Sequence, residues 1–371
     1  GDFTFTRGSV ATRINAQGLI ENVASGQSRL DYPMIDGVQK GCPHHILEPA
    51  RTNLILNSQK ISLTPTKAGT FVDNFAISPD GTLNATKLTA TDVDPYFYQN
   101  ISYSAVSYTA SIYIKGIGNS VGKEFQIRLG TNIYTDVIPL EWTRFKYTVT
   151  MASGVTSAGL EIPNPAVVGD EVLVWGWQVE VGSYVTSYIP TNGESGGVTR
   201  SAETASGAGN STTFNDSEGV LMAEISALAN DSTNRQMTLS DGTNDNRLVL
   251  KYDNQSNIIQ SFNRISGVES AFLSASVTDI TLFSKCLVKY KVNDYQLWIN
   301  GFKLDTDTSA SVWPTSTLND LRINAGGGAD FYGNVKQLQY FDSAIADTQL
   351  EQLTSWTSFT DMANGQLYTI E

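Results

Sequence analysis

Nine residues, YTASIYIKG (Tyr108–Gly116), decide the fold class of this chain. Apolar side chains at every second position, from Tyr108 to Ile114, alternate with polar or exposed ones, which is the period of a half-buried β-strand. The same period returns in EFQIRLG (124–130), TRFKYTVT (143–150) and EVLVWGWQVE (171–180), and in the last of these we expect Trp175 and Trp177 to share one face. Clusters of Gly, Asn, Ser and Pro separate these stretches, so the pattern predicts an antiparallel β-sandwich.

The second half of the chain repeats this organisation after a break in composition. Apolar residues nearly vanish between Pro190 and Gly219, which predicts a connector. Strand patterns resume in GVLMAEISAL (219–228), NRLVLKYD (246–253) and CLVKYKVNDYQLWINGFKL (286–304), the last a hairpin turning at Asn293-Asp294. Only SAIADTQLEQLTSW (343–356) is typical of a helix, with Asp347 as its expected N-cap. We therefore expect an all-β chain with two sandwiches in tandem and one short C-terminal helix.

Composition restricts the partners that this chain can bind. At 371 residues the chain is long enough for two domains, and charged residues make up only 16% of it. Its net charge of −13 argues against nucleic acid and anionic membranes, and leaves neutral ligands such as glycans open. Cys42 and Cys286 match no metal or redox spacing, so we expect free thiols. The sequence has no long apolar run and no leader pattern, so we expect neither membrane insertion nor a signal peptide.

Three stretches together resemble bacteriophage virion proteins of the tail-fibre, head-fibre or spike kind. They are ATRINAQGLIENV with RLDYP near the N-terminus, LEPARTNLILNS (47–58), and VWGWQVEVGSYVTSYIPT followed by VTRSAE. The resemblance implies an N-terminal preamble (1–58) that docks on a carbohydrate-binding-module-like jelly roll (59–190). A connector (191–218) would lead to a sandwich (219–371) that is similar to laminin-G and concanavalin-A-like domains. By the same resemblance the EPARTN segment (48–53) is a docking strip for the preamble, and the protein is expected on the virion surface after assembly in the host cytoplasm.

The sequence lacks the arrangements on which hydrolytic and lyase chemistry depend. It contains no G-x-S-x-G elbow, no H-E-x-x-H and no paired C-x-x-C. The only histidines, His44 and His45, are adjacent in the preamble, so in an extended strand their side chains point in different directions. We therefore expect a non-enzymatic protein that binds glycans. Its other expected partners are further virion subunits or copies of itself. The alternatives are a polysaccharide-degrading jelly-roll enzyme and a purely structural capsid or tail component.

Aromatic residues are the strongest candidates for a glycan site, because the C–H face of a sugar stacks on a ring. Tyr96 and Tyr98 share one strand face, Trp177 is a candidate platform, and Trp298 has the opposite parity to its neighbours Leu297 and Ile299. We expect Trp298 to stand off the apolar face of the second sandwich, although core packing is a competing interpretation for every one of these aromatics.

Two acidic turns are candidates for Ca²⁺. They contain Asp92 and Asp94, and Asp241 and Asp245, whose oxygens suit an irregular calcium loop. Neither turn has EF-hand spacing, and Asp is also a preferred turn residue, so plain turns fit the same sequence.

Overall fold

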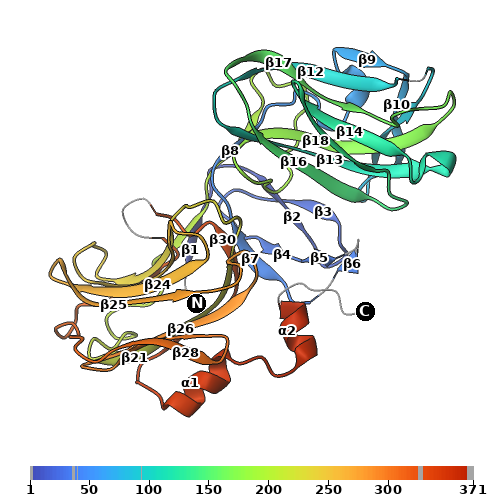
Figure 1. Ribbon diagram of the computed structural model, residues 1–371. Coiled ribbons are helices and arrows are strands. Elements are labelled where there is room, and N and C mark those ends of the chain that lie inside the picture. The colour runs from blue at the N-terminus through green and yellow to red at the C-terminus, as the bar shows by residue number, and fades with distance from the viewer. Residues whose placement is uncertain (1–2, 36–37, 40, 93, 325–328, 366–371) are drawn as a thin grey trace.

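The computed structural model describes residues 3–35, 38–39, 41–92, 94–324 and 329–365. Two β-sandwiches make up most of the molecule, and the N-terminal strands lie between them (Figure 1). Every strand pair in the described residues is antiparallel. The expected all-β architecture is confirmed.

The first sandwich consists of two five-stranded sheets. One sheet has the order β10 (Thr70–Ile77), β11 (Leu83–Thr89), β18 (Glu171–Val181), β13 (Ser107–Ile117) and β16 (Thr143–Thr150). The other has the order β15 (Asn132–Val137), β14 (Glu124–Leu129), β17 (Gly154–Glu161), β12 (Tyr96–Tyr103) and β9 (Thr66–Ala68). Two short 3-10 turns, η1 (Ile61–Leu63) and η2 (Gly118–Ser120), accompany them. The alternating residues of β13 all face the core between these sheets, as their period predicts.

The second sandwich consists of a seven-stranded and a five-stranded sheet. The larger has the order β28 (Phe302–Asp307), β27 (Tyr295–Ile299), β26 (Ser284–Lys291), β21 (Glu218–Ala227), β30 (Gly333–Phe341), β7 (His44–Leu47) and β4 (Leu30–Asp31). The smaller has the order β25 (Val268–Ser276), β24 (Ile258–Ile265), β23 (Arg247–Tyr252), β22 (Arg235–Ser240) and β29 (Asp320–Arg322). The expected hairpin is confirmed as β26 and β27, and Asn293 in its turn has a φ of 58°.

In the described residues after the last strand there are two helices, one more than the sequence predicts. Helix α1 (Asp347–Thr354) is the expected one, but its N-cap is Ala346 and not Asp347. Asp347 lies in the first turn, where a carboxylate favours the helix dipole, and it forms an ion pair with Lys303 at 2.7 Å. Helix α2 (Phe359–Gly365) was not predicted, because its seven residues carry no clear apolar period.

A bulge in β18 corrects the expected arrangement of its tryptophans. Gly176 has a φ of 66°, and the pairing with β13 shifts register beside it. Such a bulge turns the following side chains to the opposite face of the sheet. Trp177 therefore lies in the core between the sheets, whereas Trp175 lies on the outer face against Ile20 and Tyr188.

The preamble contacts both sandwiches. Its hairpin of β2 (Ala11–Ile14) and β3 (Ile20–Val23) covers Trp175 of the first sandwich. Strands β4 and β7 extend the larger sheet of the second sandwich through pairing of β7 with β30. The remaining short strands form three further pairs: β1 (Thr4–Thr6) with β20 (Thr204–Ser206), β8 (Arg51–Asn53) with β19 (Val198–Arg200), and β5 (Met34–Ile35) with β6 (Val38–Gln39). Strands β19 and β20 belong to the expected connector, so that segment pairs with the preamble along part of its length.

The docking strip (48–53) joins these parts through side chains as well as strands. Asn53 donates hydrogen bonds to the carbonyls of Trp177 at 3.2 Å and Ile189 at 2.9 Å, which ties the strip to the first sandwich. Leu47, just before the strip, is buried in the core of the second sandwich. Nε of Arg51 lies 3.8 Å from Oε2 of Glu180, so its guanidinium faces a carboxylate.

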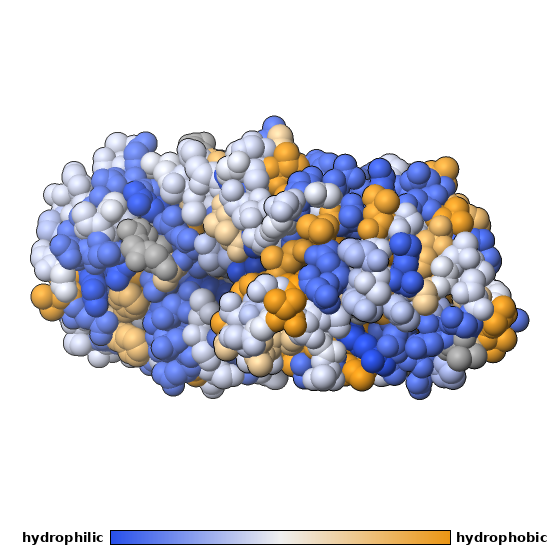
Figure 2. Space-filling model, turned by 90° about the horizontal axis from the view of Figure 1, so that it is seen from above, coloured by the Kyte–Doolittle hydropathy of each residue, from blue (hydrophilic) through white to orange (hydrophobic). Residues whose placement is uncertain are grey.

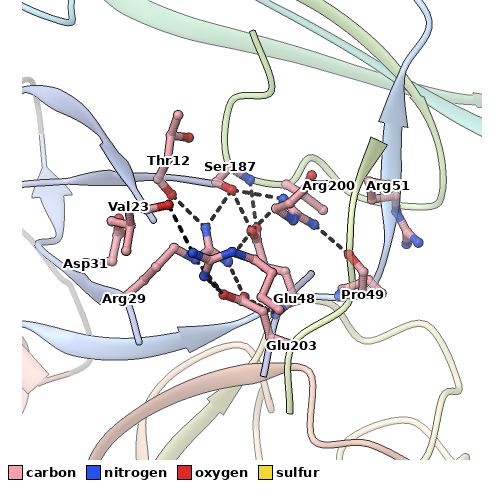
Figure 3. A network of polar contacts seen from close by, with 12 residues as sticks. Thr12, Val23, Arg29, Asp31, Glu48, Pro49, Arg51, Ser187, Arg200 and Glu203 are labelled. Carbon is pink, nitrogen blue, oxygen red and sulfur yellow. Dashed lines mark hydrogen bonds and ion pairs between the residues drawn. The ribbon is translucent and has the colours of Figure 1, made fainter. Parts of the chain in front are cut away.

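Glu48 lies at the centre of a buried ionic network between the sandwiches (Figure 3). Its carboxylate faces Arg29 at 2.8 Å and Arg200 at 2.7 Å, and accepts hydrogen bonds from the backbone and hydroxyl of Ser187. Glu203 is the second carboxylate of the network and pairs with Arg7 at 2.6 Å and with Arg29. The acid that interrupts the apolar run at residue 48 is therefore structural: it links preamble, connector and first sandwich.

Candidate functional site

The outer face of the β15-β14-β17-β12-β9 sheet of the first sandwich contains a pair of tyrosine rings, both on β12. Tyr96 and Tyr98 lie on this face with ring centres 5.8 Å apart and planes inclined by 21°. Between them in sequence, Phe97 points inward and is fully buried. Strand alternation thus presents two nearly parallel, half-buried rings to the outside, as the sequence predicts.

A glycine opens a hollow beside these rings. Strand register places Gly159 between Tyr98 of β12 and Arg128 of β14. A Cβ atom at Gly159 would lie 2.5 Å from the Cβ of Tyr98 and 2.6 Å from the carbonyl oxygen of Phe97, so no larger residue fits. The hollow has a volume of about 190 Å³ and is lined by Asp94, Tyr96, Phe97, Tyr98, Arg128, Gly130, Ser157, Gly159, Leu160 and Glu161. We call it the tyrosine hollow.

Polar groups at the wall of the tyrosine hollow are held in fixed positions. Nη2 of Arg128 donates to Oε1 of Gln126 at 2.7 Å and to Oε2 of Glu161 at 2.6 Å. Asn164 donates to the same Glu161 oxygen at 2.8 Å. Nε of Arg128 is buried and has no hydrogen-bond partner among the described residues.

The charge of the tyrosine hollow favours a neutral ligand. Burial raises the pKa of Glu161, the charge of Arg128 opposes that rise, and the nearby Asp94 adds to it. Two carboxylates and one guanidinium therefore face the same space, which disfavours an anionic group there. Rings that stack on a C–H face, with charged and amide groups that meet hydroxyls, are chemically suited to a neutral saccharide.

The structure does not bring Trp177 to this site. Its side chain is only 3% exposed and contacts Phe97 edge-on, with ring centres 5.1 Å apart. The expectation that Trp177 is a sugar platform is therefore wrong, and the core interpretation holds for it.

Trp298 is covered, although its parity was predicted correctly. Leu297 and Ile299 face the core between the sheets, and Trp298 faces the other side of β27. There helix α1 packs on it through Leu350, its side chain is 5% exposed, and its Nε1 donates to Gln296 at 2.8 Å. The expected exposure on a binding surface is wrong, because the sequence pattern of one strand does not reveal which element covers its outer face.

The acidic turns have structural partners of their own. Asp92 accepts a hydrogen bond from the backbone of Asp94 at 3.0 Å, and Asp241 accepts from the backbone of Thr243 at 2.8 Å and from Asn246 at 2.9 Å. The carbonyl of Asp245 accepts from the backbone of Gly267. Within the described ranges, no group of three or more His, Cys, Asp or Glu residues is placed to hold a metal ion. The turn interpretation accounts for these contacts, and the calcium site stays a prediction.

The two histidines contact different rings. His44 meets Phe283 edge-on at 5.5 Å, whereas His45 stacks on Phe5 at 5.6 Å. Burial, with the charge of Lys336, lowers the pKa of His44 to about 3. Both thiols are free, with Cys42 exposed and Cys286 buried. No described helix has the length and apolar character needed to cross a membrane.

Sequence reasoning identified the two tyrosines but missed Arg128, Gly159 and Glu161. The outward position of Arg128 follows from the period of EFQIRLG, in which Phe125, Ile127 and Leu129 face the core. No sequence pattern marks Gly159 or Glu161, because their role arises from the register of β17 between β12 and β14.

Comparisons with known proteins find solved structures of low similarity. No family model matches the chain, and no curated protein matches it. A similar solved structure is the CBM40 module of the Ruminococcus gnavus IT-sialidase bound to α2,3-sialyllactose, with 17% identity, a TM-score of 0.34, and coverage of 40% of this chain and 93% of that one. Domains LG4–5 of the mouse laminin α1 chain have 8% identity and a TM-score of 0.28, and cover 79% of this chain and 95% of their own. The tandem CBM22-1–CBM22-2 domain of Paenibacillus barcinonensis Xyn10C has 10% identity and a TM-score of 0.26, and covers 80% and 99%. At these TM-scores the likenesses decide neither a ligand nor a source for this protein.

Proposed function

We propose that this protein is a non-enzymatic glycan-binding protein and that the tyrosine hollow binds a neutral saccharide. One observation carries the proposal: Tyr96 and Tyr98 form a ring pair beside a hollow that Gly159 keeps open. A sugar ring lies against the tyrosines, and Arg128 and Glu161 meet its hydroxyls. In line with the sequence resemblance, we place the protein on a phage virion surface, in several copies, where it serves attachment to host or environmental glycans. Several weak sites acting together give firm attachment.

A glycan array with and without calcium, followed by titration of the best neutral saccharide, tests the hollow. Tyr96→Ala and Tyr98→Ala should each weaken binding by roughly 1 to 3 kcal/mol, by analogy with the loss of an aromatic side chain that stacks on a nucleic-acid base. Phe302→Ala is the matched control, because that ring is 68% exposed on the second sandwich, far from the hollow in sequence. Unchanged affinity in both tyrosine variants, or no saccharide bound at all, would refute the proposal. A calcium-dependent signal that the tyrosine variants leave intact would move the site to the acidic turns.

The enzymatic alternative deserves a direct assay, because Glu161 has a raised pKa and lies near Asp94. Paired carboxylates with separated pKa values are the machinery of glycosidases. Here the Oε2 atom of Glu161 accepts hydrogen bonds from both Arg128 and Asn164, an arrangement that suits a fixed acceptor. We expect no new reducing ends on a polysaccharide panel. Release that Glu161→Gln abolishes would make the protein an enzyme.

A further inference from the structure

A second cluster of charges lies far from the tyrosine hollow, on the outer face of the β25-β24-β23-β22-β29 sheet. In Figure 1 this sheet is the upper layer of the second sandwich, and the left part of Figure 2, seen from above, is mainly hydrophilic. Strand register sets Arg247 of β23 directly opposite Arg264 of β24. Their sequence neighbours Leu248 and Asn263 form the next pair and are fully buried, so the two arginines project outward. Like charges directly opposite each other on a sheet are destabilising.

Neither arginine forms an ion pair with a carboxylate in the described part of the chain. No ion pair within 4.0 Å joins either side chain to a described carboxylate. Arg247 donates only to the neutral Oδ1 of Asn244, at 2.8 Å, and the Nε atoms of both arginines are buried without a partner. Other arginines of this sheet differ, since Arg235 pairs with Asp231 at 2.7 Å and Arg322 with Asp320.

An aromatic ring gathers these cations on one surface. The centre of the Phe262 ring lies 5.4 Å from Cζ of Arg247, 5.8 Å from Cζ of Arg264 and 6.0 Å from Nζ of Lys251. Phe272, opposite Phe262 in register, is 46% exposed and extends the apolar surface. Cation–ring contacts at these distances hold the guanidiniums in place.

Nearby acids limit what can bind there. Burial and the charge of Arg264 lower the pKa of Arg247. Asp245, in the turn before β23, opposes this decrease through its negative charge. Glu269 lies opposite Arg264 on β25. With these acids at one end and a net charge of −13 on the chain, a uniform polyanion such as nucleic acid is disfavoured. A single anionic group beside an apolar ring suits the surface, because paired guanidiniums match the oxygens of carboxylate and sulfate groups.

We propose that Arg247 and Arg264 form an anion-recognition site that binds a carboxylate or sulfate group of an acidic polysaccharide, with the sugar ring against Phe272. This site is separate from the tyrosine hollow in residues and in charge preference. The bound anion then contacts two guanidiniums that form no ion pair within 4.0 Å with a described carboxylate. Each sandwich then has its own class of saccharide, neutral for the first and acidic for the second.

Affinity electrophoresis of the full chain through gels that contain heparin, polygalacturonate or dextran tests the proposal. Heparin presents sulfate and polygalacturonate carboxylate, and dextran is neutral. We expect retardation by at least one of the two acidic polymers, and at least a tenfold loss of affinity for it in the Arg247→Gln/Arg264→Gln variant. The control Lys60→Gln/Lys146→Gln removes the same charge from exposed positions of the first sandwich and should leave retardation unchanged. Tyr96→Ala/Tyr98→Ala should also leave it unchanged, which separates this site from the proposed function.

Three results would overturn the proposal: no retardation by either acidic polymer, equal loss in the lysine control, or equal retardation by single-stranded DNA. The last two would mean attraction by bulk charge. Thermal unfolding checks that the double arginine variant folds, and its midpoint should not fall, because a like-charge contact is removed. If the double variant does not fold, Arg264→Lys takes its place. It retains the charge but loses the planar fork, so a several-fold loss is expected, and unchanged affinity would count against the site.

Discussion

Replacing Glu48 by Gln should strongly destabilise the protein, because this residue is the meeting point of the buried ionic network. Glutamine preserves the shape but removes the charge that faces Arg29 and Arg200. Three arginines of the network, including Arg7, would then share the single carboxylate of Glu203. Removing one partner of a buried ion pair leaves the other charges uncompensated, which typically costs about 3 to 5 kcal/mol.

The pKa of Glu48 gives an independent magnitude. Burial raises this pKa, but the charges of Arg200 and Arg29 and the hydrogen bond from Ser187 outweigh burial and lower it from 4.5 to about 2. That difference corresponds to about 3 to 4 kcal/mol of unfolding free energy, at about 1.4 kcal/mol per pKa unit. Because the folded-state pKa is depressed, this stabilisation is fully present above pH 4.5 and is lost as the pH falls towards 2.

Urea denaturation of wild type and Glu48→Gln between pH 7 and pH 2.5 measures both effects. The difference in unfolding free energy should be about 3 to 4 kcal/mol at pH 7 and should shrink steadily below pH 4.5. Glu141→Gln is the control, since its ion pair with Lys115 is at the surface and the Glu141 side chain is 74% exposed. That variant should lose less than about 1 kcal/mol. A loss in Glu48→Gln no larger than in the control, or one independent of pH, would refute the role of the network.

Three further outcomes follow from single side chains. Gly159→Ala should lower the free energy of unfolding by about 1 to 3 kcal/mol and weaken saccharide binding, because the added Cβ would displace Tyr98. Thermal unfolding measures the first effect and calorimetric titration the second, and a variant with unchanged stability and affinity would contradict the prediction. Trp298→Ala should reduce the free energy of unfolding by about 3 to 5 kcal/mol without changing saccharide affinity, and a mild loss would mean that helix α1 does not cover this indole. The stabilisation that depends on neutral His44 should decline as the pH falls from 6.5 to about 3, because burial and the charge of Lys336 lower the pKa of this histidine. In urea denaturation at a series of pH values, His44→Leu should therefore show a smaller change of unfolding free energy with pH than the wild type. An identical pH dependence would contradict the assignment.

Local alternation of side chains was enough to predict the class of fold. In β13 and β14 the residues that the period-two pattern predicts to face inward all lie in the core of the first sandwich. The turn at Asn293 was predicted from residue types that accept a positive φ. The orientation of Tyr96 and Tyr98 away from Phe97 followed from the same rule. These features depend on neighbours within one strand or one turn, and their physical cause is therefore present in a few consecutive residues.

Contacts between distant strands decided the rest. Gly176 reversed the side-chain alternation of β18, and helix α1 buried an indole that its own strand directs outward. Glu48 became a structural acid because Arg200, which is 152 positions later in the chain, and Arg29 both meet it. Gly159 opens a hollow only because register places it between Tyr98 and Arg128. The sequence therefore determined which faces of the strands are apolar, whereas only the tertiary structure determined what each face contacts, because packing and charge pairing join residues that no local pattern connects.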